Sequence, residues 1–484
     1  MHAKTLGRRG LGALLAILAM ITTLLVVLPA TASAGETECN PDYVRKDMIG
    51  WHVYPAGGDD TENIQCAIDE AVAYGAGARI FLAEGTFYTD WIRAVDFYGK
   101  FRGAGYDHTT IQPLEGGLDC VAAIEAGDAV TWWGFRSSRV MFQDLAMDIP
   151  LACAEPYDEF IDPEGFGFAF QDFFAMVAVT DSRRAEGSDA CGELDHGALR
   201  LRKVNATAPF PDFEAPVFNP TGAFAAFFAG GSGTEGCDVN DPLMGKVRVV
   251  HSTIDGFGSP LFVDNWYESQ LVFKNNTVGV TDVGIIGSHL EHSTLRVLDN
   301  EMTSVAFTTV LVDACTGTAV GEPTCASAMK VRVKDNVIHA DGSEVGVVAF
   351  DELVEPGGIN LRITDNEIHQ YGSFAGIVNL GVDDARIRRN HHVGEGVFGT
   401  FVEGVVNGGR IIGNDMTGLG TLEAGILLGP DTSGILVKNN PGATVVDLGG
   451  NIVLGVIASA NDFLGLDRRG LAVDRGYMNW TIAR

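Results

Sequence analysis

Three aspartates and one histidine stand at the ends of short apolar segments in the second half of the chain. Asp264, Asp313 and Asp351 directly follow runs of aliphatic or aromatic residues, and His289 follows a similar run that closes with Gly-Ser. Two nearby carboxyl groups can serve as general acid and general base in cleaving a glycosidic bond, and a histidine can assist proton transfer. We interpret these four residues as candidate catalytic groups. The alternative is that acids ending strands simply meet solvent.

Three further residues near this row are candidates for substrate binding. Trp266 and Tyr267 follow Asp264 closely and offer rings on which a sugar could stack, although ordinary packing explains both rings equally well. Glu403 ends another apolar segment and extends the acidic row.

No residue pattern identifies a metal site. Ca²⁺ is the one cofactor that the acidic row leaves open, and no loop has the EF-hand form. His391, His392 and Glu395 indicate a metal only weakly, because neighbouring residues on a strand point to opposite faces. No CxxC or Cys/His cluster suggests zinc.

These candidates are embedded in a repeat that organises the chain from residue 247 onward. An aliphatic-x-aliphatic segment followed by a polar pair recurs with a base spacing of 24 residues, ending at Asn276, Asn300, Asn336, Asn366, Asn390, Asn414 and Asn440. Each unit has strand segments of period two and is too short to bury a core alone, so the units must stack. The sequence therefore predicts a parallel β-solenoid with one coil per repeat, in which the asparagines stack and satisfy turn backbone groups.

An amphipathic helix precedes the repeats. Asp60-Thr61 opens it, apolar residues from Ile64 to Val72 share one side, and Gly75 stops it. A solenoid has an open end that needs covering, so this helix is expected to cap the first coil. The expected organisation is a signal peptide over 1–34, an N-terminal arm and capping helix over 35–77, a β-helix over 78–460 and a C-terminal cap over 461–484.

The N-terminal motifs carry a family resemblance. Asp59-Asp60-Thr61, Ile64-Gln65, Ile80-Phe81-Leu82, Glu84-Gly85-Thr86-Phe87 and Arg102-Gly103-Ala104-Gly105 resemble the pectin-lyase-like right-handed parallel β-helix superfamily, with its PbH1-type repeats. The resemblance covers roughly residues 55 to 460 and implies an all-β, right-handed parallel β-helix with an N-terminal capping α-helix.

The same resemblance implies a range of functions. The superfamily includes pectate and other polysaccharide lyases, polygalacturonase-type hydrolases, tailspike depolymerases, epimerases and non-catalytic surface proteins, so the fold alone does not give the reaction. The polygalacturonase motif set is not present as a set, and no pectate-lyase Arg-x-Pro-x-x-Arg occurs.

The net charge of the chain limits which binding partners are favourable. The chain has 33 Lys+Arg against 63 Asp+Glu and a formal net charge of −30, which makes nucleic acid an unfavourable partner. An acidic substrate would need local Arg or Lys, or a bridging cation. We expect a polysaccharide partner and a monomer.

The N-terminus and the cysteines indicate export. Basic residues, an apolar run and Ala32-Ser33-Ala34 form a secretory signal, with an uncleaved anchor as the alternative and no second stretch able to span a membrane. Eight cysteines, an even number, suit disulfides in an oxidising compartment. Sequential pairing would join Cys39 with Cys66, Cys120 with Cys153, Cys191 with Cys237, and Cys315 with Cys325; the alternative is that some of these thiols stay free.

Several repeats also carry an arginine four residues before the asparagine. These are Arg248, Arg296, Arg332, Arg362, Arg386 and Arg410. Alternation places them outward, and with so many acids nearby we expect a solvated, ion-paired face in preference to an anion-binding row.

The leading functional hypothesis is a secreted, carbohydrate-active β-helix enzyme that degrades a polysaccharide. Hydrolysis is favoured over Ca²⁺-assisted elimination, because a lyase without metal wants Arg or Lys near the sugar carboxylate and this row offers carboxylates. The alternative is a non-catalytic glycan-binding or cell-surface β-helix protein.

Overall fold

The structure is a computed structural model. It describes residues 39–115, 130–149, 174–180, 195–208, 225–230, 243–316, 324–325, 328–341, 345–351 and 358–454. The predicted signal peptide, residues 1–34, and the predicted C-terminal cap, residues 461–484, lie outside the described residues.

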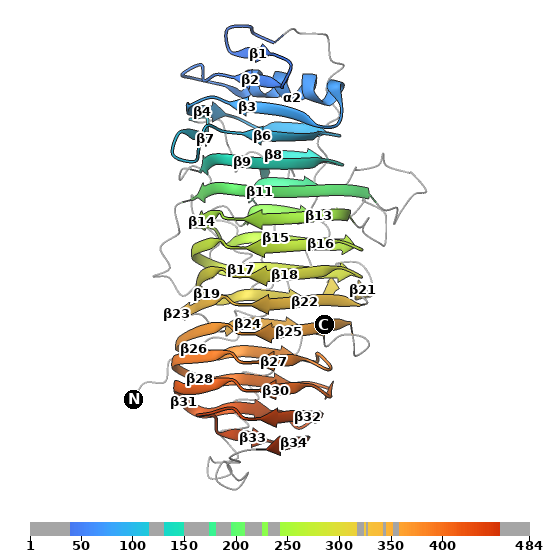
Figure 1. Cartoon of the computed structure of the whole chain (residues 1–484), viewed down its shortest axis with the longest axis vertical. Helices are drawn as coiled ribbons and strands as arrows, with labels where there is room; N and C mark the ends of the chain where they lie inside the picture. The colour runs from blue at the N-terminus through green and yellow to red at the C-terminus, as the bar shows by residue number, and fades with distance from the viewer. Residues whose placement is uncertain are drawn as a thin grey trace, which may run out of the picture.

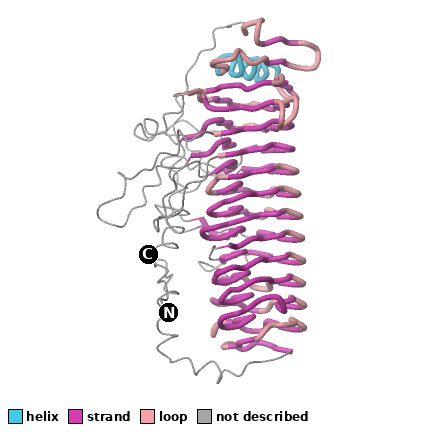
Figure 2. The backbone as a smooth tube through the Cα atoms, turned by 90° about the vertical axis from the view of Figure 1, so that its left-hand side faces the viewer, coloured by secondary structure: helices cyan, strands magenta, loops and turns pink. Residues whose placement is uncertain are grey.

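The strands wind through the molecule in stacked coils (Figure 1, Figure 2). Neighbouring coils pair in parallel, and each full coil contributes to three long faces. This topology is a right-handed parallel β-helix and confirms the fold expected from the sequence.

The first face consists of β5 (Ile92–Val95), β8 (Val130–Arg136), β10 (Phe174–Thr180), β12 (Ala225–Gly230), β15 (Ser259–Tyr267), β24 (Val345–Phe350), β33 (Val445–Asp447) and the C-terminal parts of β17 (Thr277–Glu291), β19 (Glu301–Asp313), β26 (Glu367–Leu380), β28 (His391–Glu403) and β31 (Asp415–Leu428).

The second face consists of β2 (Trp51–Val53), β3 (Ala78–Leu82), β6 (Tyr98–Arg102), β13 (Leu243–Val250), β16 (Gln270–Lys274), β18 (Thr294–Leu298), β22 (Met329–Lys334), β25 (Ile359–Thr364), β27 (Arg386–Arg388), β30 (Arg410–Ile412), β32 (Thr432–Lys438), β34 (Gly450–Leu454) and the N-terminal parts of β9 (Arg139–Asp148) and β11 (Asp195–Thr207).

The third face consists of β4 (Gly85–Thr89), β7 (Thr109–Pro113), β14 (Thr253–Asp255), β23 (Val337–Asp341) and the remaining parts of the long strands, which turn a corner. Outside the faces, β1 (Val44–Lys46) pairs antiparallel with β2, β20 (Cys315–Thr316) pairs antiparallel with β21 (Thr324–Cys325), and β29 (Val406–Asn407) pairs with β32.

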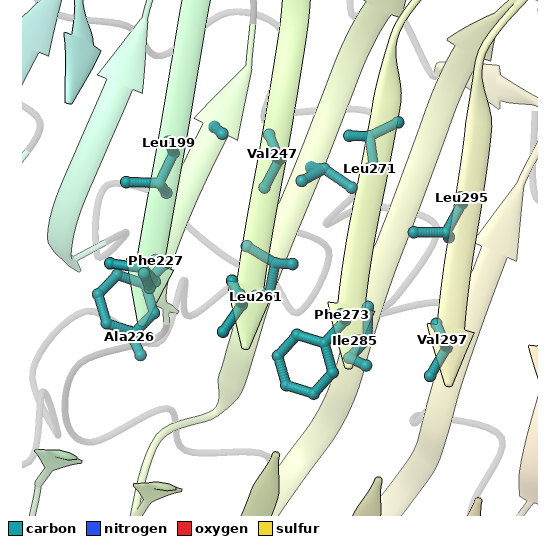
Figure 3. Close-up of a cluster of buried hydrophobic side chains, with 14 of the residues drawn as sticks. Leu199, Ala226, Phe227, Val247, Leu261, Leu271, Phe273, Ile285, Leu295 and Val297 are labelled. Atoms are coloured by element: carbon teal, nitrogen blue, oxygen red, sulfur yellow. The ribbon is translucent and has the colours of Figure 1, made fainter. Parts of the chain in front are cut away.

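One hydrophobic core fills the inside of the coils. On the second face, Leu199, Val247, Leu271 and Leu295 are register partners on successive strands and are fully buried (Figure 3). Phe227, Leu261 and Ile285 come from the first face and belong to the same cluster. The period of two sends alternate side chains inward, so like residues stack from coil to coil.

A ladder of asparagines runs along the turn between the second and third faces. Its members are Asn276, Asn300, Asn336, Asn366, Asn390, Asn414 and Asn440. Each Nδ2 donates to the Oδ1 of the next member; Asn366, for example, donates to Asn390 at 2.9 Å and to the Val333 carbonyl oxygen at 3.1 Å. The backbone N–H of Asn366 donates to the same Oδ1 at 3.1 Å. The predicted stacking of asparagines is confirmed.

The α-helix α2 (Thr61–Tyr74) covers the N-terminal end of the stack (Figure 2). Ile64, Ala67, Ile68 and Ala71 are buried in the core, as the apolar pattern predicts. Asp60 opens the helix, and its carboxylate accepts hydrogen bonds from the backbone N–H groups of Ala56 at 2.7 Å and Tyr88 at 3.2 Å. The aspartate therefore joins the cap to the first coils.

One predicted disulfide is present in the described residues. Cys39 and Cys66 are bonded and join the N-terminal arm to α2. The backbones of Cys315 and Cys325 lie opposite each other in β20 and β21, and their disulfide stays a prediction. Cys120, Cys153, Cys191 and Cys237 lie outside the described residues.

The asparagine ladder gives a direct test of what locks neighbouring coils together. Asn366→Ala removes the two hydrogen bonds that its Nδ2 donates, and leaves the buried backbone N–H and the Nδ2 of Asn336 without their Oδ1 partner. We expect the free energy of unfolding to fall by at least about 2 kcal/mol, measured by chemical denaturation. Asn360→Ala, at an exposed strand position, is the control and should change it by less than about 0.5 kcal/mol. Equal effects of the two changes would contradict this role.

Candidate functional site

Two of the predicted catalytic aspartates lie in one column on the first face. Asp264 in β15 is the register partner of Ser288, and Ser288 is the partner of Asp313. Val263 points into the core, so Asp264 points outward from the coil. The two aspartates are two strands apart, which places their backbones about 9.6 Å from each other.

Asp264 is a strongly perturbed acid. Its residue is only 3% exposed, and burial raises the pKa of its carboxyl to about 7. Hydrogen bonds from Ser288 and from the backbone of Asn265 oppose this rise in pKa. One carboxyl oxygen, Oδ1, has no hydrogen-bond partner among the described residues. A carboxyl that keeps its proton near neutral pH has the property required of a general acid.

His289 lies beside this column and not in it. Its backbone and that of Asn265 have positive φ, 43° and 54°, so both residues occupy the turn after the first face. The Nδ1 atom of His289 lies 3.2 Å from the Oδ1 of Asn265, and burial lowers the pKa of the ring. A neutral imidazole held by Asn265 stabilises the turn. Within the described residues, His289 makes no hydrogen bond to the carboxyl group of Asp264 or Asp313.

The prediction that Asp351 continues the column is wrong by one residue. Asp313 pairs with Phe350, so Asp351 is level with Ala314, a core residue. Asp351 is 7% exposed, and its Oδ2 accepts a hydrogen bond from the backbone N–H of Ile359 at 3.2 Å. This carboxylate holds the backbone at Ile359, the first residue of β25.

The prediction of a sugar-stacking platform is wrong for Trp266. Its ring is fully buried in the core, and its Nε1–H donates to the Ala229 carbonyl oxygen at 2.8 Å. Tyr267 is half-buried and meets the ring of His292 edge-on, with the ring centres 5.6 Å apart. Glu403, also half-buried, ends the same outward column as Asp313, three strands further along.

Next to the acidic column runs an apolar column that the sequence interpretation missed. Its members are Phe228, Phe262, Ile286, Leu311, Val348, Val378, Phe401 and Leu427, which belong to a second hydrophobic cluster. They point outward, because their sequence neighbours fill the core. A signal was present in the sequence, since uninterrupted apolar runs such as Leu261-Phe262-Val263 are typical of strands buried on both sides.

The described residues provide little support for a metal site. His391 is exposed and His392 fully buried, as alternation predicts, and burial lowers the pKa of His392 to about 3. Among the residues that the structure describes, the one group of potential ligands close enough for a shared ion is Cys39, Cys66 and Glu70, and both cysteines are in the disulfide. In the same residues, no helix is both long and apolar enough to cross a membrane.

The fold defines the class of the chain: it is a right-handed parallel β-helix protein. No protein-family model matches the sequence, and no similar sequence is found among curated proteins.

Several solved structures have a similar backbone. The mannuronan C-5 epimerase AlgE6 A-module of Azotobacter vinelandii is 13% identical, with 83% of this chain and 96% of that chain covered and a TM-score of 0.46. A GH87 α-1,3-glucanase of Streptomyces thermodiastaticus is 13% identical, covering 82% of this chain and 67% of that one at a TM-score of 0.43. The Dettilon tailspike protein is 10% identical. The match covers 83% of this chain and 68% of the tailspike chain, with a TM-score of 0.47. The likeness concerns the fold alone.

The raised pKa of Asp264 predicts how stability depends on pH. Because the folded pKa of about 7 exceeds the ordinary aspartate value of 3.8, ionisation of the buried carboxyl destabilises the folded state progressively from about pH 4 to pH 7. Asp264→Asn should therefore raise the unfolding temperature at pH 8, by an amount equivalent to at most about 4 kcal/mol, and change it little at pH 4.

Thermal unfolding between pH 4 and pH 8 measures this difference. Asp431→Asn, at an exposed turn, is the matched control and should give no pH-dependent gain. A gain for Asp264→Asn that is the same at both pH values would argue against a protonated carboxyl.

Proposed function

We propose that the chain is an exported protein that binds a polysaccharide on its first face and hydrolyses it, with Asp264 as general acid and Asp313 as general base. The observation that carries the proposal is a buried carboxyl with a pKa of about 7, in one column with a second carboxyl two strands away. The disulfide between Cys39 and Cys66 agrees with export to an oxidising compartment.

The spacing favours an inverting reaction. Inverting glycosidases hold their carboxyl groups about 6.5–9.5 Å apart so that a water molecule fits, and backbones about 9.6 Å apart allow such a separation. Asp264 would give its proton to the leaving glycosidic oxygen as the bond to the anomeric carbon breaks. Asp313 would take a proton from the water that attacks that carbon from the opposite side. Ser288, between the two acids, is small enough to leave room for the reacting groups.

A calcium-assisted elimination is less favoured at this site. Ca²⁺ prefers ionised carboxylates, and burial keeps Asp264 protonated up to about pH 7. The apolar column beside the acids is itself buried; once uncovered, it would suit the packing of sugar rings, whose C–H faces are apolar, and would be compatible with a neutral substrate.

A second candidate function is glycan binding without turnover. It is favoured by the burial of the two acids, which are 3% and 7% exposed. Hydrolysis requires that this part of the first face be uncovered when the substrate binds, whereas binding elsewhere on the solenoid has no such requirement.

A panel of neutral and uronate polysaccharides, incubated with Ca²⁺ or with EDTA, tests the two candidates. We expect new reducing ends without unsaturated products, inversion at the anomeric carbon by NMR, and rates reduced about 10²–10⁴-fold by Asp264→Asn or Asp313→Asn. Asp351→Asn keeps the hydrogen-bond acceptor for Ile359 and serves as the control, with activity near that of the unchanged protein.

Full activity after Asp313→Asn would remove that residue from the mechanism, and calcium-dependent unsaturated products would replace hydrolysis by elimination. A polysaccharide that binds without cleavage, equally well to the Asp264→Asn/Asp313→Asn double variant, would establish the second candidate.

A further inference from the structure

The second face carries a column of positive charges along most of the solenoid. Register pairs join Arg79, Lys100, Met141, Arg200, Arg248, Val272, Arg296, Arg332, Arg362, Arg386 and Arg410 in this order, from β3 to β30. Every arginine of the column is exposed. Adjacent members are separated by one strand spacing, about 4.8 Å at the backbone.

The expectation that these arginines are ion-paired is wrong for the described residues. From Arg200 to Arg410, no arginine of the column has an ion pair or hydrogen bond with any residue in the described ranges. Acids in the adjoining turns pair with other cations: Asp299 lies 3.1 Å from Lys274, and Asp365 lies 2.6 Å from Arg389. The column is therefore a row of positive charges with no ion-pair partner among the residues that the structure describes.

A groove of about 810 Å³ opens on this face across β9, β11, β13, β16 and β18. Its cationic lining residues are Arg200, Arg202, Lys246, Arg248, Lys274 and Arg296. Its lining contains no acidic residue and no Phe, Trp or Tyr, and Met141 and Val272 interrupt the cationic column there. Lys274 is ion-paired with Asp299, and the other five cations leave the groove positively charged in a chain whose net charge is −30.

The cations act on one another. Partial burial lowers the pKa of Lys100, and the positive charges of Arg102, Arg79 and Arg202 lower it further, against the opposing effect of Asp144. Like charges placed opposite each other on neighbouring strands destabilise a sheet. A bound polyanion would relieve this repulsion along the whole column.

We propose that the groove and the arginine column bind a linear anionic polysaccharide, whose carboxylate or sulfate groups meet successive guanidinium groups. Arginine presents a planar fork of donors that matches such oxyanions and forms paired hydrogen bonds with them. The site lies on the second face, so it is separate from the aspartate column on the first face. It would hold the protein on an acidic glycan whether or not the first face is catalytic.

Three observations favour a glycan over single-stranded nucleic acid. The groove has no Phe, Trp or Tyr side chain on which a base could stack, and its one ring is the imidazole of His251. The net charge of −30 repels a densely charged nucleic acid over the rest of the surface. The disulfide between Cys39 and Cys66 fits an oxidising compartment outside the cytosol, where anionic glycans are abundant.

Binding of one glucan backbone with three substituents tests the proposal: cellulose sulfate, carboxymethyl cellulose and hydroxyethyl cellulose, measured by calorimetry with the full-length protein. We expect the two anionic polymers to bind more tightly than the neutral one, with the anionic affinity falling as NaCl is raised from about 50 to about 300 mM. The double variant Arg248→Gln/Arg296→Gln should weaken anionic binding at least about tenfold, because hydrogen bonds to charged groups are lost.

The matched control is Arg45→Gln/Arg389→Gln, which removes the same charge outside the column and should change the affinity less than about twofold. Thermal unfolding should show the groove variant at least as stable as the unchanged protein, because repulsion is removed. Asp264→Asn should leave this binding unchanged, which separates the groove from the proposed hydrolysis.

Binding of the neutral polymer that the groove variant weakens as much as it weakens binding of the anionic polymers, or an unchanged anionic affinity in that variant, would overturn the proposal. Binding of a single-stranded oligonucleotide as tight as that of the anionic glucans would replace the glycan by nucleic acid. If only one of the two anionic glucans binds, the ligand class narrows to sulfate or to carboxylate.

Discussion

The hydrogen-bonded ladder from Asn276 to Asn440 is the constraint on which the rest of the molecule depends. Each amide joins a turn to the same turn of the next coil, so successive coils are locked in one register at that corner. Buried amides without such partners would be costly, so a slip by one residue is strongly disfavoured. Constant register is what converts a sequence repeat into straight columns of side chains.

Straight columns give the two outward faces opposite chemistry. The first face presents an apolar column beside Asp264, Ser288 and Asp313, and the second presents arginines. Because strands alternate, both faces still contribute to one core, as Leu261 and Val247 do. A solenoid can therefore carry a candidate acid/base site and a cationic groove at once, each built from single positions repeated along the stack.

The parts of the candidate site that follow from the sequence repeat were predictable. The parts that depend on how strands of neighbouring coils pair were not. Asp264 and Asp313 fall in one column as expected, because the pairing from Ile285 to Ser288 is in continuous register with β19 after two irregularities upstream. Asp351 is displaced by one residue, since its position follows from the pairing of β24 with β19 and not from the end of an apolar run. Trp266 follows the polar residue Asp264, so the sequence suggests a ring at the surface. The strand continues past Asp264, however, and the indole of Trp266 points into the core.

The sequence by itself determined the parallel solenoid, the asparagine stack, the helical cap and the outward direction of the arginines. These follow from periodicity and turn chemistry, which are local along the chain. Only the tertiary structure decided that Asp264 is buried with a pKa of about 7, that the first face has an outward apolar column, and that the arginines lack described ion pairs. Burial and charge pairing depend on groups from other coils, and their distances are set only when the coils stack.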